Sequence, residues 1–338
     1  MAHEGLYFDD VVEGMDIPLL VKAASNVQMF MYAAATWNCD RIHYDQQFAR
    51  DVFGLPDIVQ VGPVSADWYA QMLGEWIGGT GFIKDLSYES RISVFPGDRL
   101  ECRGRVVRKY DLKGYHAVDC DLAMVNQKGH DCSPGKARII LPAKGERRSL
   151  HDVIDELGVL TPPADATRRV PGKLLTQEMI RMIGVEAPPV VSDPITAKEI
   201  KRFALAVGDP NPAYHDDNKA REGRYGGLIA PPTYALWACH PVTQDGFVED
   251  LTAGGYPERQ AAFVIPRLPL ENPLHGGDEH EFFSPIRPGD VVTGSTKVVD
   301  VYEKIGNTRS MIFVVTETTI KNQHDRLVDV FRVTMIYY

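Results

Sequence analysis

Apolar and polar residues follow two patterns along the chain. Between Ser25 and Ala49 apolar residues recur at helical spacing, and Ser25 with Gln28 three positions later is a capping-box pattern. We therefore predict a helix that begins after Ser25 and ends near Trp37. From about Leu86 to Ala143 three segments alternate between apolar and polar residues and are separated by turn residues, which predicts β-strands.

Both patterns return later in the chain. Residues 196–220 align with residues 25–49 without a gap, at a shift of 171 positions (209 minus 38), and Thr196 with Glu199 repeats the capping box. The segments from residue 281 onward repeat the strand pattern. This internal repeat predicts two structural units of the same kind.

The two copies differ by an insertion. The Pro-Gly-Asp triplets at 96–98 and 288–290 lie 192 positions apart (288 minus 96), about twenty more than the shift between the helices. We expect the extra residues between Pro232 and Glu281, where glycine and proline residues indicate a loop. Four large aromatic residues in this region could belong to the core or shape a pocket: Tyr234, Trp237, Phe247 and Phe263.

Each copy combines a long apolar helix with several antiparallel strands. We predict an α+β fold in which each half is a long central helix wrapped by an antiparallel β-sheet. Residues 144–172 are charged and contain prolines, so we predict that they link a first unit at 1–143 to a second unit at 173–338. Two such units in one chain can pair their sheets.

Candidate chemistry follows each predicted helix. In the first copy Asn38, Asp40 and His43 bring an imidazole to the end of an apolar helix, where burial and nearby carboxylates tune a histidine. In the second copy the aligned positions hold, in the same order, Asp209, Asn211 and Tyr214. Only the first copy therefore carries a histidine there, and His43 is the first candidate for catalysis.

Composition and charge exclude several classes of function. With 338 residues, 44% of them hydrophobic and 24% charged, the chain has the composition of a globular protein. Its net charge of −10 opposes non-specific binding to nucleic acid or to an anionic membrane. The acidic first residues lack the apolar run of a secretory signal, and no apolar stretch has membrane-spanning length, so we expect a cytoplasmic protein.

Cysteine and histidine spacing gives no metal site. Five cysteines are an odd number without close pairing, which predicts reduced thiols. His275 and His280 lie close together in sequence, but their spacing fits no helix face, and we interpret this segment as a loop that enters a strand. We therefore predict no metal.

Three motifs resemble those of a known family. Residues 208–212, Gly-Asp-Pro-Asn-Pro, resemble the G-D-x-N-P-[apolar]-H signature of the MaoC-like hydratases and dehydratases, which include the (R)-specific enoyl-CoA hydratases. Residues 41–45, Arg-Ile-His-Tyr-Asp, are similar to the variant found in the catalytic half of fused, two-copy members. Residues 227–233, Gly-Leu-Ile-Ala-Pro-Pro-Thr, resemble the motif of their substrate-shaping half. The resemblance covers nearly the whole chain.

This resemblance implies a fold and an activity. The fold is a double hot-dog, and the activity is that of a hydro-lyase that interconverts a 2-enoyl-CoA and a 3-hydroxyacyl-CoA by reversible addition of water. The substrate is a coenzyme A thioester, no further cofactor is implied, and we expect a homodimer. The alternatives are a hot-dog thioesterase, which usually places an acidic or polar group on its central helix, and a protein that only binds acyl thioesters.

The resemblance also implies roles for individual residues. His43 is expected to be the general base and acid, with Asp40 orienting it or polarising water. Asn38 stands where relatives with the G-D-x-N-P signature have aspartate, and since an amide cannot accept a proton, the acid–base work shifts to His43. In the second half we expect pocket-forming, substrate-binding roles for Asp209, Asn211 and Tyr214.

A second helix supplies the remaining candidate. Residues 64–78 are a plausible helix with Pro63 at its first position, which places Gly62 at the helix N-terminus. A backbone N–H there is suited to hold a thioester oxygen as it becomes an enolate, although Gly62 could also simply form a turn. The second copy has Pro231 and Pro232 at the comparable place, and proline has no N–H. We therefore assign the oxyanion hole to the first copy.

Overall fold

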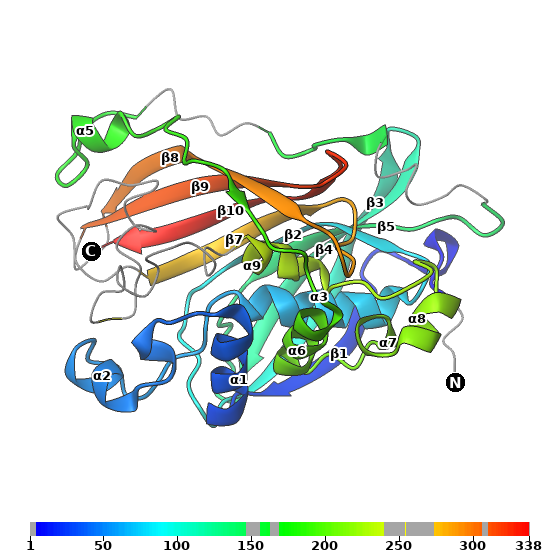
Figure 1. Ribbon diagram of the computed structural model, residues 1–338, viewed down its shortest axis with the longest axis horizontal. Helices are drawn as coiled ribbons and strands as arrows, with labels where there is room; N and C mark the ends of the chain where they lie inside the picture. Colours follow the sequence, from blue (N-terminus) through cyan, green and yellow to red (C-terminus); the bar gives the residue numbers. More distant parts are fainter. Residues whose placement is uncertain are drawn as a thin grey trace.

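In the part of the chain that the structure describes, ten antiparallel strands form one continuous sheet, five from each copy (Figure 1). The computed structural model describes residues 5–146, 156–162, 169–239, 254, 274–305 and 310–337. The first half contributes β1 (Asp16–Ala23), β2 (Phe82–Glu89), β3 (Arg99–Leu112), β4 (Tyr115–Asn126) and β5 (Gly135–Ile140). The second half contributes β6 (Val190–Val191), β7 (Leu274–Phe282), β8 (Val292–Ile305), β9 (Ser310–Asn322) and β10 (Leu327–Tyr337).

The strands of the second half follow the same order as those of the first, counted outward from the middle of the sheet. The strand order runs β1-β3-β4-β5-β2-β7-β10-β9-β8-β6, so each half repeats the same order outward from the β2–β7 pair. In that pair Leu86 lies opposite His280 and Tyr88 opposite Asp278. The backbone hydrogen bonds of an antiparallel ladder therefore join the two halves directly. This is the double hot-dog arrangement expected from the repeat.

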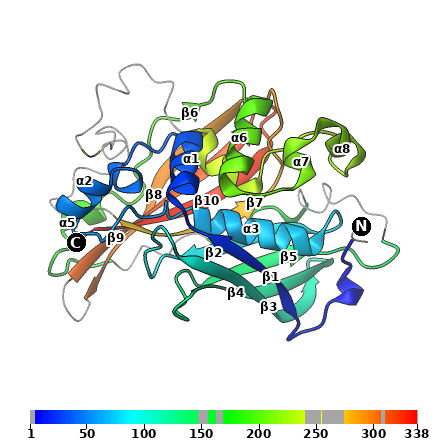
Figure 2. The same cartoon turned by 90° about the horizontal axis from the view of Figure 1, so that it is seen from below.

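Helices cover one face of this sheet. Those of the first half are α1 (Asn26–Thr36), the 3-10 turns η1 (Phe8–Asp10) and η2 (Arg41–His43), α2 (Gln46–Asp51) and α3 (Val64–Ile77). Those of the second half are α5 (Gln177–Ile180), α6 (Ala197–Val207), α7 (Pro212–His215), α8 (Asp217–Glu222), η3 (Pro232–Tyr234) and α9 (Ala235–Ala238). α3 lies across the strands of the first half, and α1 and α6 lie side by side next to it (Figure 2).

The central helix α3 is buried along almost its whole length. Trp68, Tyr69 and Leu73 are at most 1% exposed, and burying three large apolar side chains contributes several kcal/mol, at about 1.5–3 kcal/mol each. The indole N–H of Trp68 donates to the carbonyl oxygen of Val207, at the end of α6, over 3.1 Å. α3 therefore joins the core of the first half to a helix of the second.

The predicted limits of the repeated helices are confirmed. Ser25 caps α1 by accepting a hydrogen bond from the amide of Gln28 over 3.1 Å, and Thr196 forms the predicted capping box at α6. α1 ends at Trp37 in the left-handed conformation with φ 55°, where α6 ends at Gly208 with φ 72°. A tryptophan carries a steric cost in this conformation that glycine avoids. Other interactions of the folded chain therefore compensate for the steric cost of this turn.

The Pro-Gly-Asp triplets form the same turn twice, as the repeat predicts. Asp98 accepts a hydrogen bond from the amide of Phe95 over 2.9 Å and another from the Gln127 side chain over 2.6 Å. Asp290 accepts a backbone amide in the same way, and the Gln323 side chain over 2.9 Å. Each triplet thus fixes the entry to a long strand against the next hairpin.

The second half has no counterpart of full length to α3 within the residues described. Its helical segment begins at Pro232 and comprises η3 and α9, which end at Ala238. Tyr234 belongs to the core, since it is 6% exposed and packs on Phe203 with ring centroids 5.2 Å apart. The expected insertion falls largely on residues 240–253 and 255–273, which lie outside the described residues together with Phe247 and Phe263.

The predicted linker is described only in part. The amides of Leu160 and Thr161 donate to the carboxylate of Glu281, over 2.6 and 2.9 Å, and the ammonium group of Lys84 lies 3.1 Å from the same carboxylate. Lys84 and Glu281 have fully buried side chains. A buried carboxylate needs such partners, so this segment is tied to the middle of the sheet. The exact boundaries at 143, 144, 172 and 173 stay predictions.

Candidate functional site

A cavity of about 480 Å³ opens at the N-terminal end of α3. We call it the His43 cavity. Its first-half lining includes Asn38, Asp40, His43, Gln60, Gly62 and Ser65. Among the described residues of the second half, its lining consists of Leu236, Trp237, Leu274, His275, Val333, Met335 and Ile336. Both halves therefore form this cavity, as expected for a site between paired hot-dog units.

The turn that carries His43 is built by the two Asx side chains before it. Asn38 Oδ1 accepts a hydrogen bond from the amide of Asp40 over 3.1 Å. Asp40 Oδ1 accepts one from the amide of Ile42 over 3.3 Å and thereby caps η2. Such side-chain-to-backbone bonds define Asx turns. The turn brings the imidazole of His43 to the wall of the cavity.

His43 is arranged as a neutral base. Its Nδ1 lies 2.7 Å from the carbonyl oxygen of Val59, a bond in which only Nδ1–H can donate, so Nε2 carries the free lone pair. Burial lowers the pKa of His43 below its usual value, although Asp40 and the Val59 carbonyl oppose this effect. The nearest carboxylate oxygen, Asp40 Oδ2, lies 3.7 Å from Nε2. At neutral pH the ring is therefore ready to accept a proton.

Gly62 presents its backbone N–H at the start of α3. α3 begins at Val64, the first residue of the predicted segment 64–78, and Pro63 is the N-cap residue and not the first helical residue. The amide of Val64 bonds to the carbonyl of Val61 over 3.2 Å and the amide of Ser65 to that of Gly62 over 3.1 Å. Within the described part of the chain the Gly62 amide donates to no protein acceptor. It is a free donor at a helix N-terminus, which favours an anion.

Sequence reasoning missed a second histidine in this cavity. His275 lies on strand β7, and the expectation that it belongs to a loop was wrong. Its Nε2 is 2.8 Å from the hydroxyl oxygen of Tyr88 and 3.1 Å from Asp278 Oδ1, and the Tyr88 hydroxyl donates to Asp278 Oδ2 over 2.7 Å. A Cβ atom on Gly62 would lie 2.5 Å from the His275 ring. The ring therefore packs directly on the backbone of Gly62.

Two further polar groups line the His43 cavity without having been predicted. Gln60 is 7% exposed, and its side-chain oxygen has no hydrogen-bond partner among the residues described. The hydroxyl oxygens of Ser65 and Ser133 lie 3.1 Å apart. A buried acceptor without a partner costs free energy, so the Gln60 amide is placed to bond a ligand. Nothing in the sequence marked these residues, because burial depends on tertiary packing.

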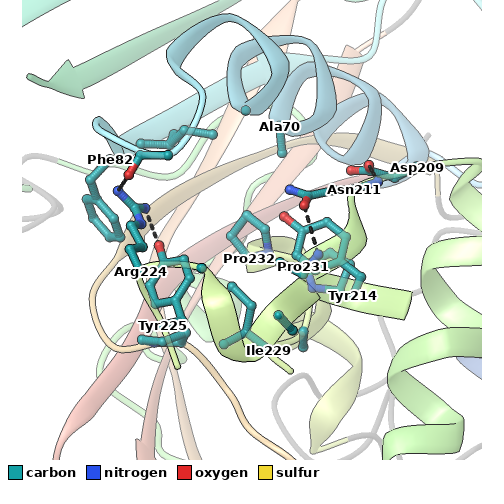
Figure 3. Close-up of a pocket in the computed structure, with 18 of the residues that line it drawn as sticks. Ala70, Phe82, Asp209, Asn211, Tyr214, Arg224, Tyr225, Ile229, Pro231 and Pro232 are labelled. Atoms are coloured by element: carbon teal, nitrogen blue, oxygen red, sulfur yellow. Dashed lines mark hydrogen bonds between the residues drawn. The ribbon is translucent and has the colours of Figure 1, made fainter. Parts of the chain in front are cut away.

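Asp209, Asn211 and Tyr214 line a different cavity, of about 610 Å³, beside the C-terminal half of α3 (Figure 3). We call it the Tyr214 cavity. Among the described residues it shares none of its lining with the His43 cavity. The second half thus lines the His43 cavity, as expected, but through other residues than these three. A substrate-binding role for them stays a prediction.

The Tyr214 cavity keeps the turn but has different chemical groups. Asp209 Oδ1 accepts from the amide of Asn211 over 2.9 Å, and Asn211 Oδ1 accepts from the amide of Ala213 over 3.0 Å. This is the Asx geometry of the first copy. Burial raises the pKa of the Tyr214 hydroxyl well above its usual value. Pro231 and Pro232 line the cavity where Gly62 lines the other one (Figure 3). Among the described residues that line this cavity there is no histidine.

Three general features complete the description. All five cysteines are free thiols. No group of three or more histidine, cysteine, aspartate or glutamate side chains is arranged to hold a metal ion in the described ranges. No helix among the described residues is long and apolar enough to cross a bilayer.

Comparison with protein families identifies both halves. Residues 20–96, which contain His43 and Gly62, match the family described as hydroxyacyl-thioester dehydratase type 2. Residues 181–330 match the FAS1-like dehydratase domain region. Each half of the chain thus resembles a dehydratase domain.

Solved structures share the whole architecture. A MaoC domain protein dehydratase from Chloroflexus aurantiacus superposes with a TM-score of 0.64 at 12% identity, over 99% of this chain and 97% of its own. Rv0216, a conserved hypothetical protein from Mycobacterium tuberculosis with a double hot-dog fold, gives a TM-score of 0.63 at 14% identity, over 99% of both chains. At these identities the likeness shows the fold alone. The class is that of the double hot-dog proteins.

Curated relatives match part of the chain. A UPF0336 protein from Streptomyces griseus is 31% identical over 129 residues, which are 37% of this chain and 74% of the relative. A UPF0336 protein from Thermobifida fusca is 31% identical over 115 residues, and the chain spans 65% of its length. A shorter match, 38% identical over 53 residues, is to the 3-oxo-4,17-pregnadiene-20-carboxyl-CoA hydratase alpha subunit of Mycobacterium tuberculosis, over 16% of this chain and 17% of that protein. The chain belongs to the MaoC-like dehydratase family.

Proposed function

We propose that this protein catalyses the reversible addition of water to a 2-enoyl thioester in the His43 cavity. The observation that carries the proposal is the pairing of a buried imidazole, with a free Nε2, and an unpartnered Gly62 amide on the wall of one cavity. The first can move a proton, and the second can hold the oxygen that becomes negative. These two groups support assigning hydro-lyase chemistry on a thioester to this cavity.

The proposed reaction uses each group once. The thioester carbonyl oxygen accepts a hydrogen bond from the Gly62 amide, and a water molecule gives a proton to Nε2 of His43 while its oxygen bonds to the β-carbon. The π electrons move through the α-carbon to the thioester oxygen, which forms an enolate. The His43 imidazolium then returns the proton to the α-carbon, so that the ring is neutral again and one water has been added.

Asp40 and Asn38 support this cycle without transferring the proton. Asp40 Oδ2, 3.7 Å from His43 Nε2, stabilises the imidazolium while it carries the proton. Asn38 holds the turn through its side-chain oxygen, which is already occupied by the Asp40 amide. The absence of an aspartate at position 38 therefore leaves His43 as the acid–base group of the turn.

Two features favour hydration over thioester hydrolysis. The acidic residue lining the cavity is Asp40, whose Oδ1 accepts the amide of Ile42 and whose Oδ2 faces His43. On α3 the carboxylate of Asp67 is buried in the core and does not line the cavity. A thioesterase of the kind described above would need an acidic or polar group of the central helix that faces the carbonyl carbon. The polar residue of α3 that lines this cavity is Ser65, and its hydroxyl is hydrogen-bonded to that of Ser133.

The apolar residues that the second half contributes to the His43 cavity bear on the class of acyl group that binds. Leu236, Trp237 and Met335 are apolar, so the acyl group is held by non-polar contact, where each methylene is worth only about 1–3 kcal/mol of discrimination. We expect a graded preference across enoyl-CoA chain lengths. The steroid-derived substrate named for the M. tuberculosis hydratase subunit supports including bulky acyl groups among the candidates.

The test separates hydration from hydrolysis. The protein is incubated with crotonyl-CoA, hexenoyl-CoA and dodecenoyl-CoA while the absorbance of the conjugated thioester and the release of free thiol are followed together. Loss of conjugation without thiol release supports the proposal, and thiol release at the same rate as loss of absorbance contradicts it. His43→Gln is the matched loss variant and Tyr214→Phe the matched control in the other cavity. Turnover that survives His43→Gln would place the chemistry elsewhere.

A further inference from the structure

The N-terminus of α3 offers only one free donor to a ligand. Pro63 has no N–H, and the amides of Val64 and Ser65 already bond to the carbonyls of Val61 and Gly62. Among the described residues from Gly62 to Ser65, Gly62 is therefore the one whose amide has no acceptor. An enolate oxygen with two lone pairs is held far better by two donors than by one.

His275 is the polar group that stands next to this single donor. Its ring packs against the Gly62 backbone, and it lines the cavity from the second half. Nε2 lies 2.8 Å from the hydroxyl oxygen of Tyr88, to which its N–H donates because the Tyr88 hydroxyl itself donates to Asp278, and 3.1 Å from Asp278 Oδ1. Nδ1 has no protein partner in the part of the chain described. Nδ1 is therefore the ring nitrogen of His275 that can bond to a ligand.

We propose that His275, as an imidazolium, donates a hydrogen bond from Nδ1 to the thioester oxygen and completes the oxyanion site together with the Gly62 amide. The inference rests on the proposed function and deepens it. It makes the catalytic site a joint product of the two halves, because the base and one donor come from the first half and the second donor comes from the second.

The surroundings of His275 supply the charge that this role needs. Asp278 is 1% exposed, and although burial alone raises the pKa of its carboxyl, the charges and hydrogen bonds of His275, His280 and Tyr88 bring the pKa below its usual value. A buried carboxylate that stays ionised 3.1 Å from Nε2 stabilises a positive ring. The Tyr88 hydroxyl donates to the same carboxylate and fixes its orientation.

The two histidines are therefore set up for opposite tasks. His43 is buried against a neutral carbonyl and a carboxylate oxygen 3.7 Å away, which keeps it a base. His275 has a closer and more deeply buried carboxylate and a free Nδ1, which suits a donor. The Pro-Gly-Asp alignment places Ile83 of the first copy opposite His275 of the second (275 minus 192), and Ile83 lines the Tyr214 cavity. The cavity without Gly62 thus also lacks the second donor.

The first experiment compares two histidines of one strand. His275→Phe keeps a ring against Gly62 but removes the donor, and His275→Gln retains an N–H group that can reach the oxygen. The control is His280→Gln: His280 also bonds a buried carboxylate, Asp329 over 2.8 Å, but does not line the cavity. Steady-state kinetics and thermal unfolding are measured for all three with the best substrate of the panel.

The expected pattern is specific. His275→Phe lowers kcat about a hundredfold with KM changed much less, and His275→Gln recovers a part of that loss. His280→Gln lowers the unfolding temperature and lowers kcat far less than His275→Phe does, because it leaves the His275 ring and its Nδ1 in place. Equal kcat for His275→Phe and His280→Gln would mean that His275 only stabilises the fold, and the proposal would be wrong.

The second experiment measures a bound ligand by spectroscopy, so it requires neither turnover nor variants as stable as the wild type. Crotonyl-CoA labelled with ¹³C at the thioester carbonyl is bound to His43→Gln and to the double variant His43→Gln/His275→Phe, and the carbonyl stretch is recorded by infrared difference spectroscopy. We expect a shift to lower frequency in the first that is reduced in the second. The same frequency in both contradicts the role of His275, whereas failure of the ligand to bind either variant contradicts the proposed function itself.

Discussion

The His43 cavity and the Tyr214 cavity derive from aligned segments, yet they differ at each position that could move a proton or hold a negative charge. His43 aligns with Tyr214 and His275 aligns with Ile83, while Pro231 and Pro232 occupy the place comparable to that of Gly62. The turn that precedes them is the same in both copies, with two Asx side chains that accept backbone amides. The fold therefore requires the turn, and it does not require the imidazole.

This difference separates structural residues from chemical ones without reference to any other protein. A residue type present in both cavities can be explained by the backbone it supports, as for Asn38 and Asp209. A group present in only one cavity has no such explanation, because the other half folds without it. His43 and the free N–H of Gly62 belong to this second kind.

The largest expected effect comes from removing the base. His43→Ala lowers kcat by about a hundredfold or more with KM little altered, because no other group takes the proton from water. Tyr214→Ala, at the aligned position, changes kcat by less than about threefold. Stopped-flow measurement of the loss of thioester conjugation checks both. Equal losses in the two variants would break the comparison, since the second cavity would then take part in the reaction.

A smaller loss is expected when the oxyanion site is crowded. In Gly62→Ala the new Cβ would lie 2.5 Å from the His275 ring, which Tyr88 and Asp278 hold in place, so the ring and the amide are pushed apart. We expect kcat to fall about ten- to a hundredfold. Pro232→Ala in the other cavity serves as the control and leaves kcat near the wild-type value. Wild-type kcat in Gly62→Ala would show that the Gly62 amide does not contact the reacting oxygen.

Acyl selectivity gives a more modest test. Trp237 lines the His43 cavity, and its indole N–H donates to the Tyr32 hydroxyl over 3.2 Å. Trp237→Ala enlarges the apolar wall, so the ratio of kcat/KM for dodecenoyl-CoA over crotonyl-CoA is expected to rise about tenfold. Tyr225→Ala, which changes the lining of the Tyr214 cavity, leaves the ratio unaltered. If both variants shift the ratio, the acyl chain reaches both cavities.

The smallest effect concerns stability and its dependence on pH. Burial raises the pKa of the Asp209 carboxyl, so the folded state binds this proton more tightly than the unfolded state does. The contribution of this carboxyl to the free energy of unfolding is therefore lost as pH rises from the unfolded pKa, near 3.8, through the raised folded value.

Asp209→Asn keeps an oxygen that can accept the Asn211 amide and removes this proton linkage. At pH 8 the variant is expected to be as stable as the wild type or more stable, by up to about 1 kcal/mol, and the difference disappears toward pH 4. Chemical unfolding at the two pH values provides the measurement. A large loss of kcat in Asp209→Asn, equal to that of His43→Ala, would instead move the catalytic site to the second half.

The features that sequence could predict are those fixed by local order. The caps at Ser25 and Thr196, the end of the first helix at Trp37 and the paired Pro-Gly-Asp turns all involve partners a few residues apart or a repeat visible within the chain. These predictions are confirmed by the geometry. The position of His43 beyond the end of the first helix also follows from a short turn, whereas its catalytic role stays a prediction.

The features that sequence could not predict depend on which strands meet. His275 and Tyr88 are 187 positions apart, and they touch because β2 pairs with β7 in a register that no local pattern specifies. The separation of the two cavities has the same origin, because it depends on where α3 lies between the halves. Gln60 was missed because its lack of a hydrogen-bond partner appears only once its surroundings are packed.

The pairing of β2 with β7 inside a single chain also changes how mutations act. In an assembly of two identical subunits every substitution appears twice, so a change that improves one site for binding also alters the site that carries out the reaction. Here each position of the seam and of both cavities exists once. A substitution at Tyr214 leaves His43 untouched, so aligned positions of the two halves can differ without the paired change that identical subunits impose.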